Sequence, residues 1–334
     1  MRRREFIGLL GATALSISRP GHAQKRTDLP LVGFLLPAKS ESEIAKARAA
    51  ALRKGLQEER LVEGKNYSLA MRFAEGDLDR LPQLAMELGA LNPRVIVMGG
   101  YFPYKTVHTR LPQIPIVFTG IAADPIALGW AQSYAHPGGM ITGNVLNAAG
   151  GEETMVQKRI GLFKQLVPDL TRLGVIASEE AIIYLKEGDA LRKVATELGF
   201  ELLHYRLKTV DDLESAFAAG LRDDVSAFYI SGEPMLFINL SRVMSLVTAS
   251  RKPSVGPYPD WGRAGLLMSY STDPLDGFRR AGAYAAKILN GARAGDLPIE
   301  QASKFTLVIN QKSATALGIV VPPTLLALAD EVIE

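Results

Sequence analysis

Short runs of apolar residues recur along the chain, each bounded by polar or glycine residues. The runs are continuous rather than alternating, as in LVGFLL at residues 31–36 and FTLVIN at residues 305–310. Continuous apolarity over a few residues is typical of strands that are covered on both faces, as in a parallel sheet. Seven such runs predict strands, at residues 31–36, 94–100, 115–120, 173–178, 226–231, 265–270 and 305–310.

Longer amphipathic stretches lie between these runs. Their apolar residues recur with the spacing of one helical face, which predicts helices at residues 43–58, 78–91, 154–166, 211–221 and 274–289. Strand and helix therefore alternate along most of the chain. This order is typical of α/β proteins that are built on parallel sheets.

The chain also resembles itself. LVGFLL is followed by Ala-Leu-Arg-Lys at residues 51–54, a strand ending at Phe73, a helix and RVIVMGG. LGVIAS is followed by the same four letters at residues 190–193, a strand ending at Leu207, a helix and SAFYIS. The shared order predicts two similar Rossmann-like α/β lobes, which arose either by duplication or as two independent βαβ units. A length of 334 residues agrees with two domains.

Polar and glycine residues follow the predicted strands at their carboxyl ends, where open parallel sheets bind ligands. The candidate contacts are Ser40, Gly100, Tyr101, Thr119, Asp124, Ser178, Gly232, Glu233 and Tyr258. Glycine lets backbone amides approach a ligand, and hydroxyl groups add directional hydrogen bonds. Each residue alone has a simpler explanation as a cap or turn former, and Asp124 in particular precedes Pro125 as a helix cap would. The prediction therefore depends on loops converging from both lobes.

The charged and hydroxyl candidates suggest how a zwitterion would bind. Glu233, Glu179 and Asp124 would neutralise an ammonium group of the ligand. Ser40, Thr119 and the amides of the loops would hold a carboxylate. This combination favours an amino acid or a similar solute.

The N-terminus has the layout of an export signal. The three arginines at residues 2–4 precede an apolar stretch at residues 7–18 that is too short to span a bilayer. Pro20 ends the stretch, and the small residues that follow predict cleavage after Ala23. Residues 1–23 are therefore expected to be a signal peptide, and the mature protein is expected in the periplasm. The pair Arg3-Arg4 resembles the twin-arginine signal of bacteria.

Removal of this segment changes the charge balance. The whole chain has 38 Lys and Arg against 35 Asp and Glu, and residues 1–23 hold four of the former and one of the latter, so 34 of each remain. A neutral mature chain gives no electrostatic basis for a nucleic-acid or anionic-membrane partner. The chain has no cysteine, so it has no disulfide, thiolate metal site or thiol nucleophile.

Three segments carry a specific resemblance. They are residues 55–88, which begin GLQEERLVEG, residues 114–143, which include AHPGGMITG, and the C-terminal stretch from GLLMSYSTDP at residue 265 to the end. These segments resemble the substrate-binding proteins of bacterial ABC importers, in the tryptophan-binding-like group, and the resemblance covers about residues 29–334.

The resemblance implies a type 1 periplasmic binding protein fold, the Venus flytrap, with crossovers between the lobes and no catalysis. One lobe is expected to comprise residues 30–148 with about 270–300, and the other residues 149–269 with about 301–334. Many relatives that this chain resembles have a Gly-Thr-Pro type loop where it has GGYFPYKTV.

The aromatic residues of that loop are Tyr101, Phe102 and Tyr104. They form either a stacking wall for a planar ligand or ordinary core beneath the loop. The segment VGPYPDW at residues 255–261 also replaces a plainer sequence, so Tyr258 or Trp261 could close over the ligand.

The motifs of common enzymes are absent. The sequence contains no G-x-S-x-G, H-E-x-x-H, Walker A or G-x-G-x-x-G motif, and its four histidines are widely separated. We therefore expect no catalytic residue, metal or cofactor. The expected function is capture of a small organic solute, an amino acid or aromatic compound, by a monomer that delivers it to an ABC permease with a separate ATPase. A periplasmic sensor that presents its solute to a receptor is the alternative.

Overall fold

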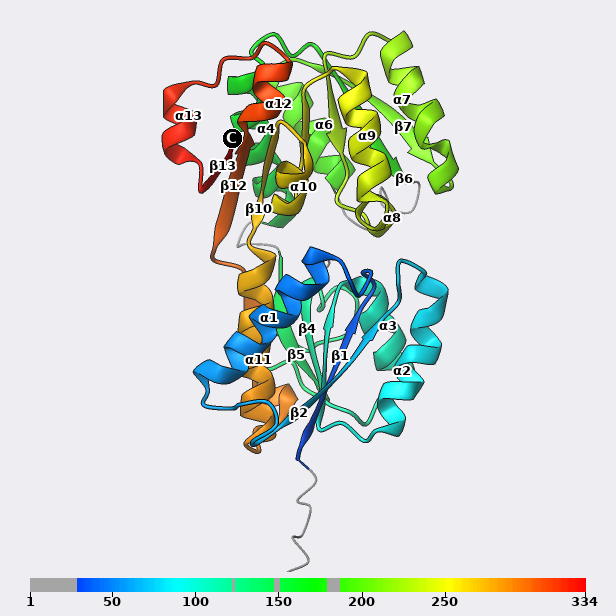
Figure 1. The fold of residues 1–334 in the computed structure, drawn as a ribbon, viewed down its shortest axis with the longest axis vertical. Coiled ribbons are helices and arrows are strands. Elements are labelled where there is room, and N and C mark those ends of the chain that lie inside the picture. Colours follow the sequence, from blue (N-terminus) through cyan, green and yellow to red (C-terminus); the bar gives the residue numbers. More distant parts are fainter. Residues whose placement is uncertain (1–28, 122–123, 147–150, 179–186) are drawn as a thin grey trace, which may run out of the picture.

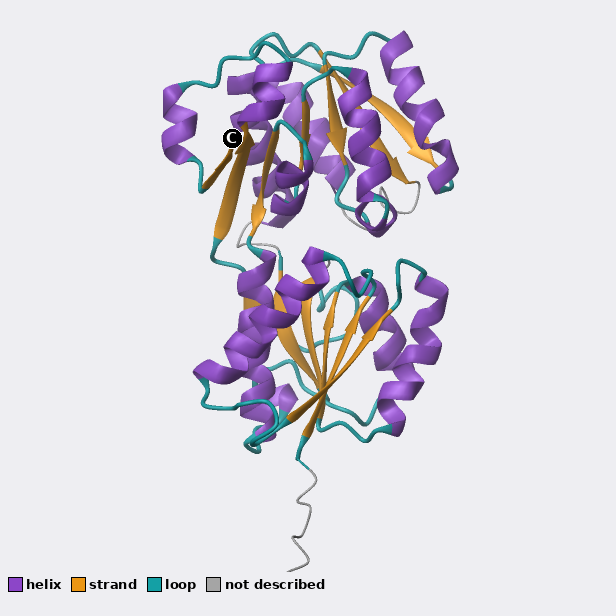
Figure 2. Ribbon diagram, in the orientation of Figure 1, coloured by secondary structure: helices purple, strands orange, loops and turns teal. Residues whose placement is uncertain are grey.

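The computed structural model describes residues 29–121, 124–146, 151–178 and 187–334. The export segment expected at residues 1–23 and the candidate Glu179 lie outside these ranges. The described residues form two lobes that follow one another along the longest axis of the molecule (Figure 1). Each lobe is a sheet with helices on both faces (Figure 2).

The first lobe contains a sheet of six strands, all paired in parallel, in the order β11-β5-β4-β3-β1-β2. The strands are β1 (Leu31–Leu36), β2 (Ser68–Phe73), β3 (Val95–Gly99), β4 (Ile116–Ile121), β5 (Ile141–Val145) and β11 (Glu300–Gln301). The helices are α1 (Glu43–Glu58), α2 (Leu81–Ala90), α3 (Tyr101–Arg110) and α11 (Pro274–Leu289), with short 3-10 turns at Leu78–Arg80 and Ala294–Asp296.

The second lobe contains a sheet of seven strands in the order β13-β12-β10-β9-β8-β6-β7, in which only the β10–β12 pair is antiparallel. The strands are β6 (Arg172–Ser178), β7 (Glu201–Leu207), β8 (Ala227–Ile230), β9 (Ser254–Gly256), β10 (Met268–Thr272), β12 (Phe305–Asn310) and β13 (Glu331–Ile333). The helices are α4 (Gly151–Leu166), α6 (Glu187–Leu198), α7 (Leu213–Arg222), α8 (Pro234–Ile238), α9 (Leu240–Ser250), α10 (Pro259–Ala264), α12 (Gln311–Ala316) and α13 (Pro323–Leu328), with a 3-10 turn at Val210–Asp212.

The two lobes share a substructure, as the internal resemblance predicts. Strands β3, β1 and β2 are neighbours in the first sheet, and β8, β6 and β7 are neighbours in the same order in the second. In both lobes the chain visits them as strand, helix, strand, helix, strand. The carboxyl ends of these strands point toward the other lobe (Figure 2).

The chain passes between the lobes more than once. It does so after β5, again between β10 and α11, and again between β11 and β12. Helix α11 therefore belongs to the first lobe, although strands of the second lobe precede and follow it. Its apolar face packs into the core of the first lobe, where Phe278, Tyr284 and Ile288 are buried together with Phe34 and Leu52.

Helices α1 and α11 pack unusually closely, because glycines stand at their contact. A Cβ atom at Gly55 of α1 would lie 1.8 Å from the carbonyl oxygen of Arg279, and one at Gly282 of α11 would lie 2.2 Å from that of Leu52. Ser42 caps the start of α1, where its hydroxyl oxygen accepts a hydrogen bond from the amide of Ala45 at 3.2 Å. The cap and the close packing together fix α1 against the sheet.

Candidate functional site

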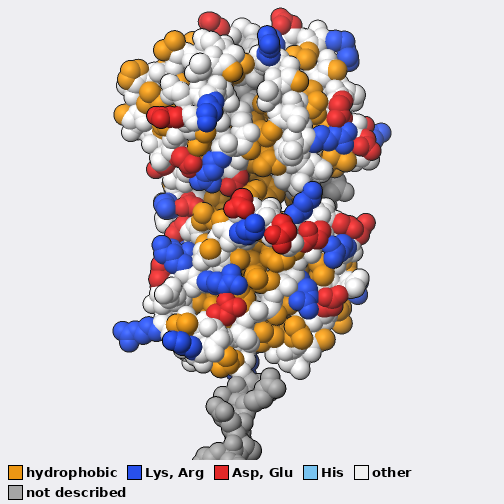
Figure 3. All heavy atoms as spheres, in the orientation of Figure 1, with side chains coloured by type: hydrophobic (Ala, Val, Ile, Leu, Met, Phe, Trp, Pro, Cys, Tyr) orange, Lys and Arg blue, Asp and Glu red, His pale blue; other side chains and the backbone are white. Residues whose placement is uncertain are grey.

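A cleft of about 450 Å³ lies between the lobes, where the carboxyl ends of the strands face each other. Both lobes line it, and its walls are largely apolar. Figure 3 shows apolar side chains gathered at the waist of the molecule, with charged side chains around them. A cleft of this size at the junction of two domains is typical of a small-molecule site.

Six of the nine residues that the sequence predicts as contacts line this cleft. They are Gly100, Tyr101, Ser178, Gly232, Glu233 and Tyr258. Gly100 and Tyr101 lie where β3 passes into α3, and Ser178 ends β6. Gly232 and Glu233 lie between β8 and α8, and Tyr258 lies between β9 and α10. The convergence of loops from both lobes, on which the prediction depended, is therefore present.

Thr119 does not line the cleft. Its side chain points into the first lobe and is only 1% exposed. Its hydroxyl donates a hydrogen bond of 2.7 Å to Oδ1 of Asn144, whose Nδ2 in turn donates one of 2.9 Å to the carbonyl of Gly277. Thr119 thus ties β4 to β5 and α11. The neighbouring Gly120 lines the cleft in its place.

Ser40 and Asp124 also lie away from the cleft lining. The backbone amide of Ser40 donates a hydrogen bond of 3.1 Å to Oε1 of Glu75. Oδ1 of Asp124 accepts one of 2.9 Å from the amide of Ile126 and one of 3.3 Å from the hydroxyl of Tyr134. Ser40 therefore joins the segment after β1 to the segment after β2. Asp124 stabilises a local turn, which is the simpler of the two roles that its sequence position allows.

The sequence left two roles open for the aromatic residues after β3, a stacking wall for a ligand or ordinary core, and the structure shows some of them in each position. Tyr101 and Phe102 line the cleft, and the ring of Tyr101 stacks on Trp130 with centroids 5.3 Å apart. Tyr104 is fully buried in the core, where its ring lies 4.0 Å from that of Trp130 and 5.6 Å from that of Phe118. The first two form a wall of the cleft, and the third supports that wall from behind.

The aromatic residues of VGPYPDW divide in the same way. Tyr258 lines the cleft, and its hydroxyl donates a hydrogen bond of 2.8 Å to the carbonyl of Gly232. Its ring also meets that of Phe237 edge to face at 5.4 Å. Trp261 is fully buried in the second lobe and does not reach the cleft.

Glu233 places a nearly buried carboxylate at the cleft. It is 3% exposed, and one of its oxygens accepts a hydrogen bond from the amide of Ser178 while the other accepts one from the hydroxyl of the same residue. These contacts join the loops that follow β6 and β8. They hold the carboxylate in a defined place, where it can accept a further hydrogen bond from a ligand.

The residues that line the cleft without having been predicted include Arg48 of α1, Phe237 of α8 and Phe278 of α11. The Arg48 side chain is 11% exposed, and burial lowers the pKa of its guanidinium. A signal for Arg48 existed, because it lies three residues after Ala45 and four before Leu52, both of which are on the buried face of α1. A charged residue on the buried face of a helix needs a specific partner.

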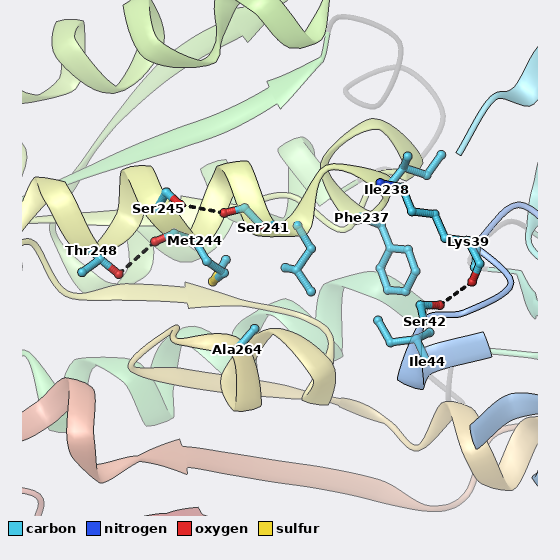
Figure 4. Close-up of a pocket in the computed structure, with 12 residues that line it drawn as sticks. Lys39, Ser42, Ile44, Phe237, Ile238, Ser241, Met244, Ser245, Thr248 and Ala264 are labelled. Atoms are coloured by element: carbon cyan, nitrogen blue, oxygen red, sulfur yellow. Dashed lines mark hydrogen bonds between the residues drawn. The ribbon is translucent and has the colours of Figure 1, made fainter. Parts of the chain in front are cut away.

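A second groove, of about 730 Å³, lies beside the cleft. Phe237 and Ile238 line both spaces. Figure 4 shows the Phe237 ring facing Ser42 and Ile44, and helix α9 forming another wall of the groove. Along α9 the hydroxyl of Ser245 bonds to the carbonyl of Ser241 at 3.0 Å, so this wall presents polar groups that its own backbone already satisfies.

The described part of the chain contains no helix that is long and apolar enough to cross a membrane. Within the same residues, no group of three or more His, Cys, Asp or Glu side chains is placed to hold a metal ion.

Two similar α/β lobes, joined by several crossovers around a cleft that both of them line, define the fold of the type 1 periplasmic binding proteins. The family follows from the sequence. The chain belongs to the ABC transporter substrate binding protein family, whose model matches residues 41–333. Membership in this family confirms the expected resemblance, and it makes the protein a binding protein and not an enzyme.

A similar curated protein is the "Tyrosine-binding protein" of Clostridioides difficile (strain R20291), which is 20% identical over 264 residues, covering 79% of this chain and 74% of the relative. A solved structure from Streptococcus pneumonia, an ABC domain in complex with L-Trp, has a TM-score of 0.79 at 21% identity and covers 91% of this chain and 100% of its own. A conserved domain protein from Vibrio cholerae has the same TM-score at 23% identity, over 91% and 99% of the two chains. These structures establish the fold.

Proposed function

We propose that the protein is the solute-binding component of an ABC importer. The protein acts as a monomer in the periplasm, where it captures a small solute, an amino acid with an aromatic side chain, between its lobes. It then delivers the solute to a membrane permease that a separate ATPase powers. The observation that carries this proposal is the cleft between the lobes, which aromatic side chains from both lobes line. The match to an ABC transporter family favours import over presentation to a sensor.

Binding in this cleft requires the two lobes to act together. Tyr101 and Phe102 come from the first lobe, and Phe237 and Tyr258 come from the second. A flat ring between these walls would contact both lobes at once only when they are close together. Such a solute binds the closed form better than the open form, so it shifts the population toward closure, and the permease can recognise the closed form.

The chemistry of the cleft supports an amino acid. The aromatic walls provide stacking surfaces for a planar side chain. The carboxylate of Glu233 lies among them and would pair with the ammonium group of the solute. Two similar proteins, the tyrosine-binding protein of Clostridioides difficile and the ABC domain in complex with L-Trp, support the same class of ligand.

A thermal-shift screen tests this proposal. We expect L-tryptophan, L-tyrosine or L-phenylalanine to stabilise the purified protein, by about 2.7 kcal/mol at a hundredfold excess over the dissociation constant, while sugars and polyamines leave it unchanged. Tyr101→Ala, which removes a wall of the cleft, should reduce the shift. Tyr205→Ala is the matched control, because Tyr205 lies on β7 and bonds to Asp223 outside the cleft. A protein that none of these solutes stabilises would contradict the proposal.

We also propose that residues 1–23 direct export by the twin-arginine route and are removed after Ala23. Replacing Arg3-Arg4 by Lys-Lys should abolish the periplasmic form and leave the longer precursor in the cytoplasm, because the receptor of this route reads the arginine pair. Cell fractionation and the mass of the periplasmic form provide the measurement. Arg2→Lys is the control, since it conserves both the charge and the pair. An unchanged periplasmic yield with Lys-Lys would instead point to the general export route.

A further inference from the structure

Arg48 places a guanidinium in the cleft that has no hydrogen-bond acceptor among the residues that the structure describes. The carboxylate oxygen in reach is Oδ2 of Asp260, which lies 3.9 Å from Nη2. That distance is too long for a hydrogen bond. A guanidinium carries five N–H donors, and at 11% exposure the Arg48 side chain has little access to water.

Asp260 is a weak partner for Arg48 because another arginine already engages it. Oδ1 of Asp260 accepts a hydrogen bond of 3.0 Å from Nη1 of Arg263. Arg263 itself is fixed by Glu331, at 2.8 Å. The Asp260 carboxylate is therefore held beside α10. It attracts the charge of Arg48 electrostatically but does not form a hydrogen bond with it.

Two phenylalanine rings hold the guanidinium in place. Its central carbon lies 4.8 Å from the ring centroid of Phe237 and 5.5 Å from that of Phe278. Contacts with ring faces stabilise a cation, but they leave its N–H donors unused. The side chain is thus fixed in position while its hydrogen-bonding capacity is free, an arrangement that suits a ligand carrying the missing acceptor.

We propose that Arg48 binds the carboxylate of the solute and thereby restricts the cleft to solutes with an acidic group. A carboxylate matches the guanidinium fork with two parallel hydrogen bonds. This inference rests on the proposed capture of a solute between the lobes and names the residue that selects it. It gives Arg48 the role that the sequence assigned to Ser40 and Thr119, which lie away from the cleft.

The position of Arg48 also connects recognition to both lobes. Arg48 belongs to the first lobe, whereas Phe237 and Asp260 belong to the second. A carboxylate bound at Arg48 therefore lies at the contact between the lobes. An analogue without this group would fill the same aromatic space and leave the guanidinium without its acceptor.

Isothermal titration calorimetry with L-tryptophan, L-tyrosine and L-phenylalanine and with their primary amides tests the inference. The amides keep the ammonium group and the ring but lose the negative charge. We expect the wild-type protein to prefer the acid, and Arg48→Met to weaken binding of the acid by about tenfold to a hundredfold with little effect on the amide. Arg48→Lys should show an intermediate preference, because it keeps the charge and loses the fork.

Arg53→Met is the matched control, since Arg53 is on the same helix but pairs with Glu63 at 2.7 Å outside the cleft. It should bind the acid as the wild type does. Urea unfolding separates a folding defect from a binding defect, and Arg48→Met should be at least as stable as the wild type because it removes a buried charge without a close partner. An equal loss for acid and amide would overturn the role of Arg48.

Titration of the wild-type protein with the acids and the amides also separates this inference from the proposed function. If the wild-type protein binds the primary amides as tightly as the acids, capture between the lobes stands and selection of a carboxylate by Arg48 is wrong. If no solute of any class binds, both are wrong.

Discussion

Arg159→Met will lower the free energy of unfolding by about 3–5 kcal/mol, although Arg159 lies outside the cleft. Its side chain is buried inside the second lobe at 1% exposure. Nε donates a hydrogen bond of 2.8 Å to the carbonyl of Tyr270, and Nη1 pairs with Oε1 of Glu187 at 3.4 Å and also contacts the hydroxyl of Tyr229. Methionine fills similar space but leaves the buried Glu187 without this positive charge.

The size of this effect comes from the carboxylate that remains. Glu187 is 5% exposed, and the hydroxyl of Ser231, which donates a hydrogen bond of 2.7 Å to its Oε2, does not neutralise it. Urea unfolding followed by circular dichroism provides the measurement. The double variant Arg159→Met/Glu187→Leu should recover most of the loss, because a buried ion pair replaced as a whole costs little.

The control for this prediction is Arg192→Met. Arg192 also pairs with an acid, Asp189, but the two side chains are 55% and 75% exposed. We expect its loss to cost less than about 1 kcal/mol, as for other exposed pairs. If Arg159→Met were as mild as Arg192→Met, the buried cluster would not stabilise the lobe.

Gly55→Ala will destabilise the protein by about 3 kcal/mol, the upper end of the usual cost of overpacking. The added Cβ would lie 1.8 Å from the backbone oxygen of Arg279 on α11. A backbone atom cannot rotate away, so α1 and α11 must separate. Because α1 carries Arg48 and α11 carries Phe278, the variant should also weaken solute binding, and thermal melting with calorimetry will measure both losses.

Gly161→Ala is a matched control for this prediction. Gly161 lies within α4, and beyond its chain neighbours and the nearby backbone of its own helix no described atom lies within 4 Å of the position of its added Cβ. Alanine there should stabilise the helix by about 1 kcal/mol. Gly282→Ala provides a second test, because its Cβ would meet the backbone of Leu52 at the same helix contact. The double variant Gly55→Ala/Gly282→Ala should lose little more than either single variant, since one separation of the helices relieves both clashes.

Periodicity predicted the main elements well, because most of them obey simple rules. Strands β1 and β12 and helices α1 and α11 have the ranges that the sequence predicts. Strand β5 is not among the seven predicted strands, because it contains polar residues. Thr142 and Asn144 are buried there because distant backbone carbonyls, those of Leu297 and Gly277, accept their hydrogen bonds. Such partners are invisible in local sequence.

The sequence indicated which strand ends line the candidate cleft, but it did not indicate the direction of their side chains. Neighbouring residues of a strand point to opposite sides, so Thr119 faces the core while Gly120 lines the cleft. Arg48 was not predicted because it lies within a helix, away from the strand ends. Only the packing of the second lobe against α1, which brings Phe237 beside the guanidinium, makes Arg48 part of a cleft.

The place of α11 in the first lobe has a consequence for synthesis on the ribosome. Most of the first lobe precedes residue 146, yet its core includes Phe278, Tyr284 and Ile288. A nascent chain that has completed β5 still exposes the apolar surface that α11 will cover, and it must wait for more than a hundred further residues before that surface is buried. The two lobes therefore reach their final packing almost together, near the end of translation, and a chain interrupted before α11 is a target for chaperones and proteases rather than half of a working protein.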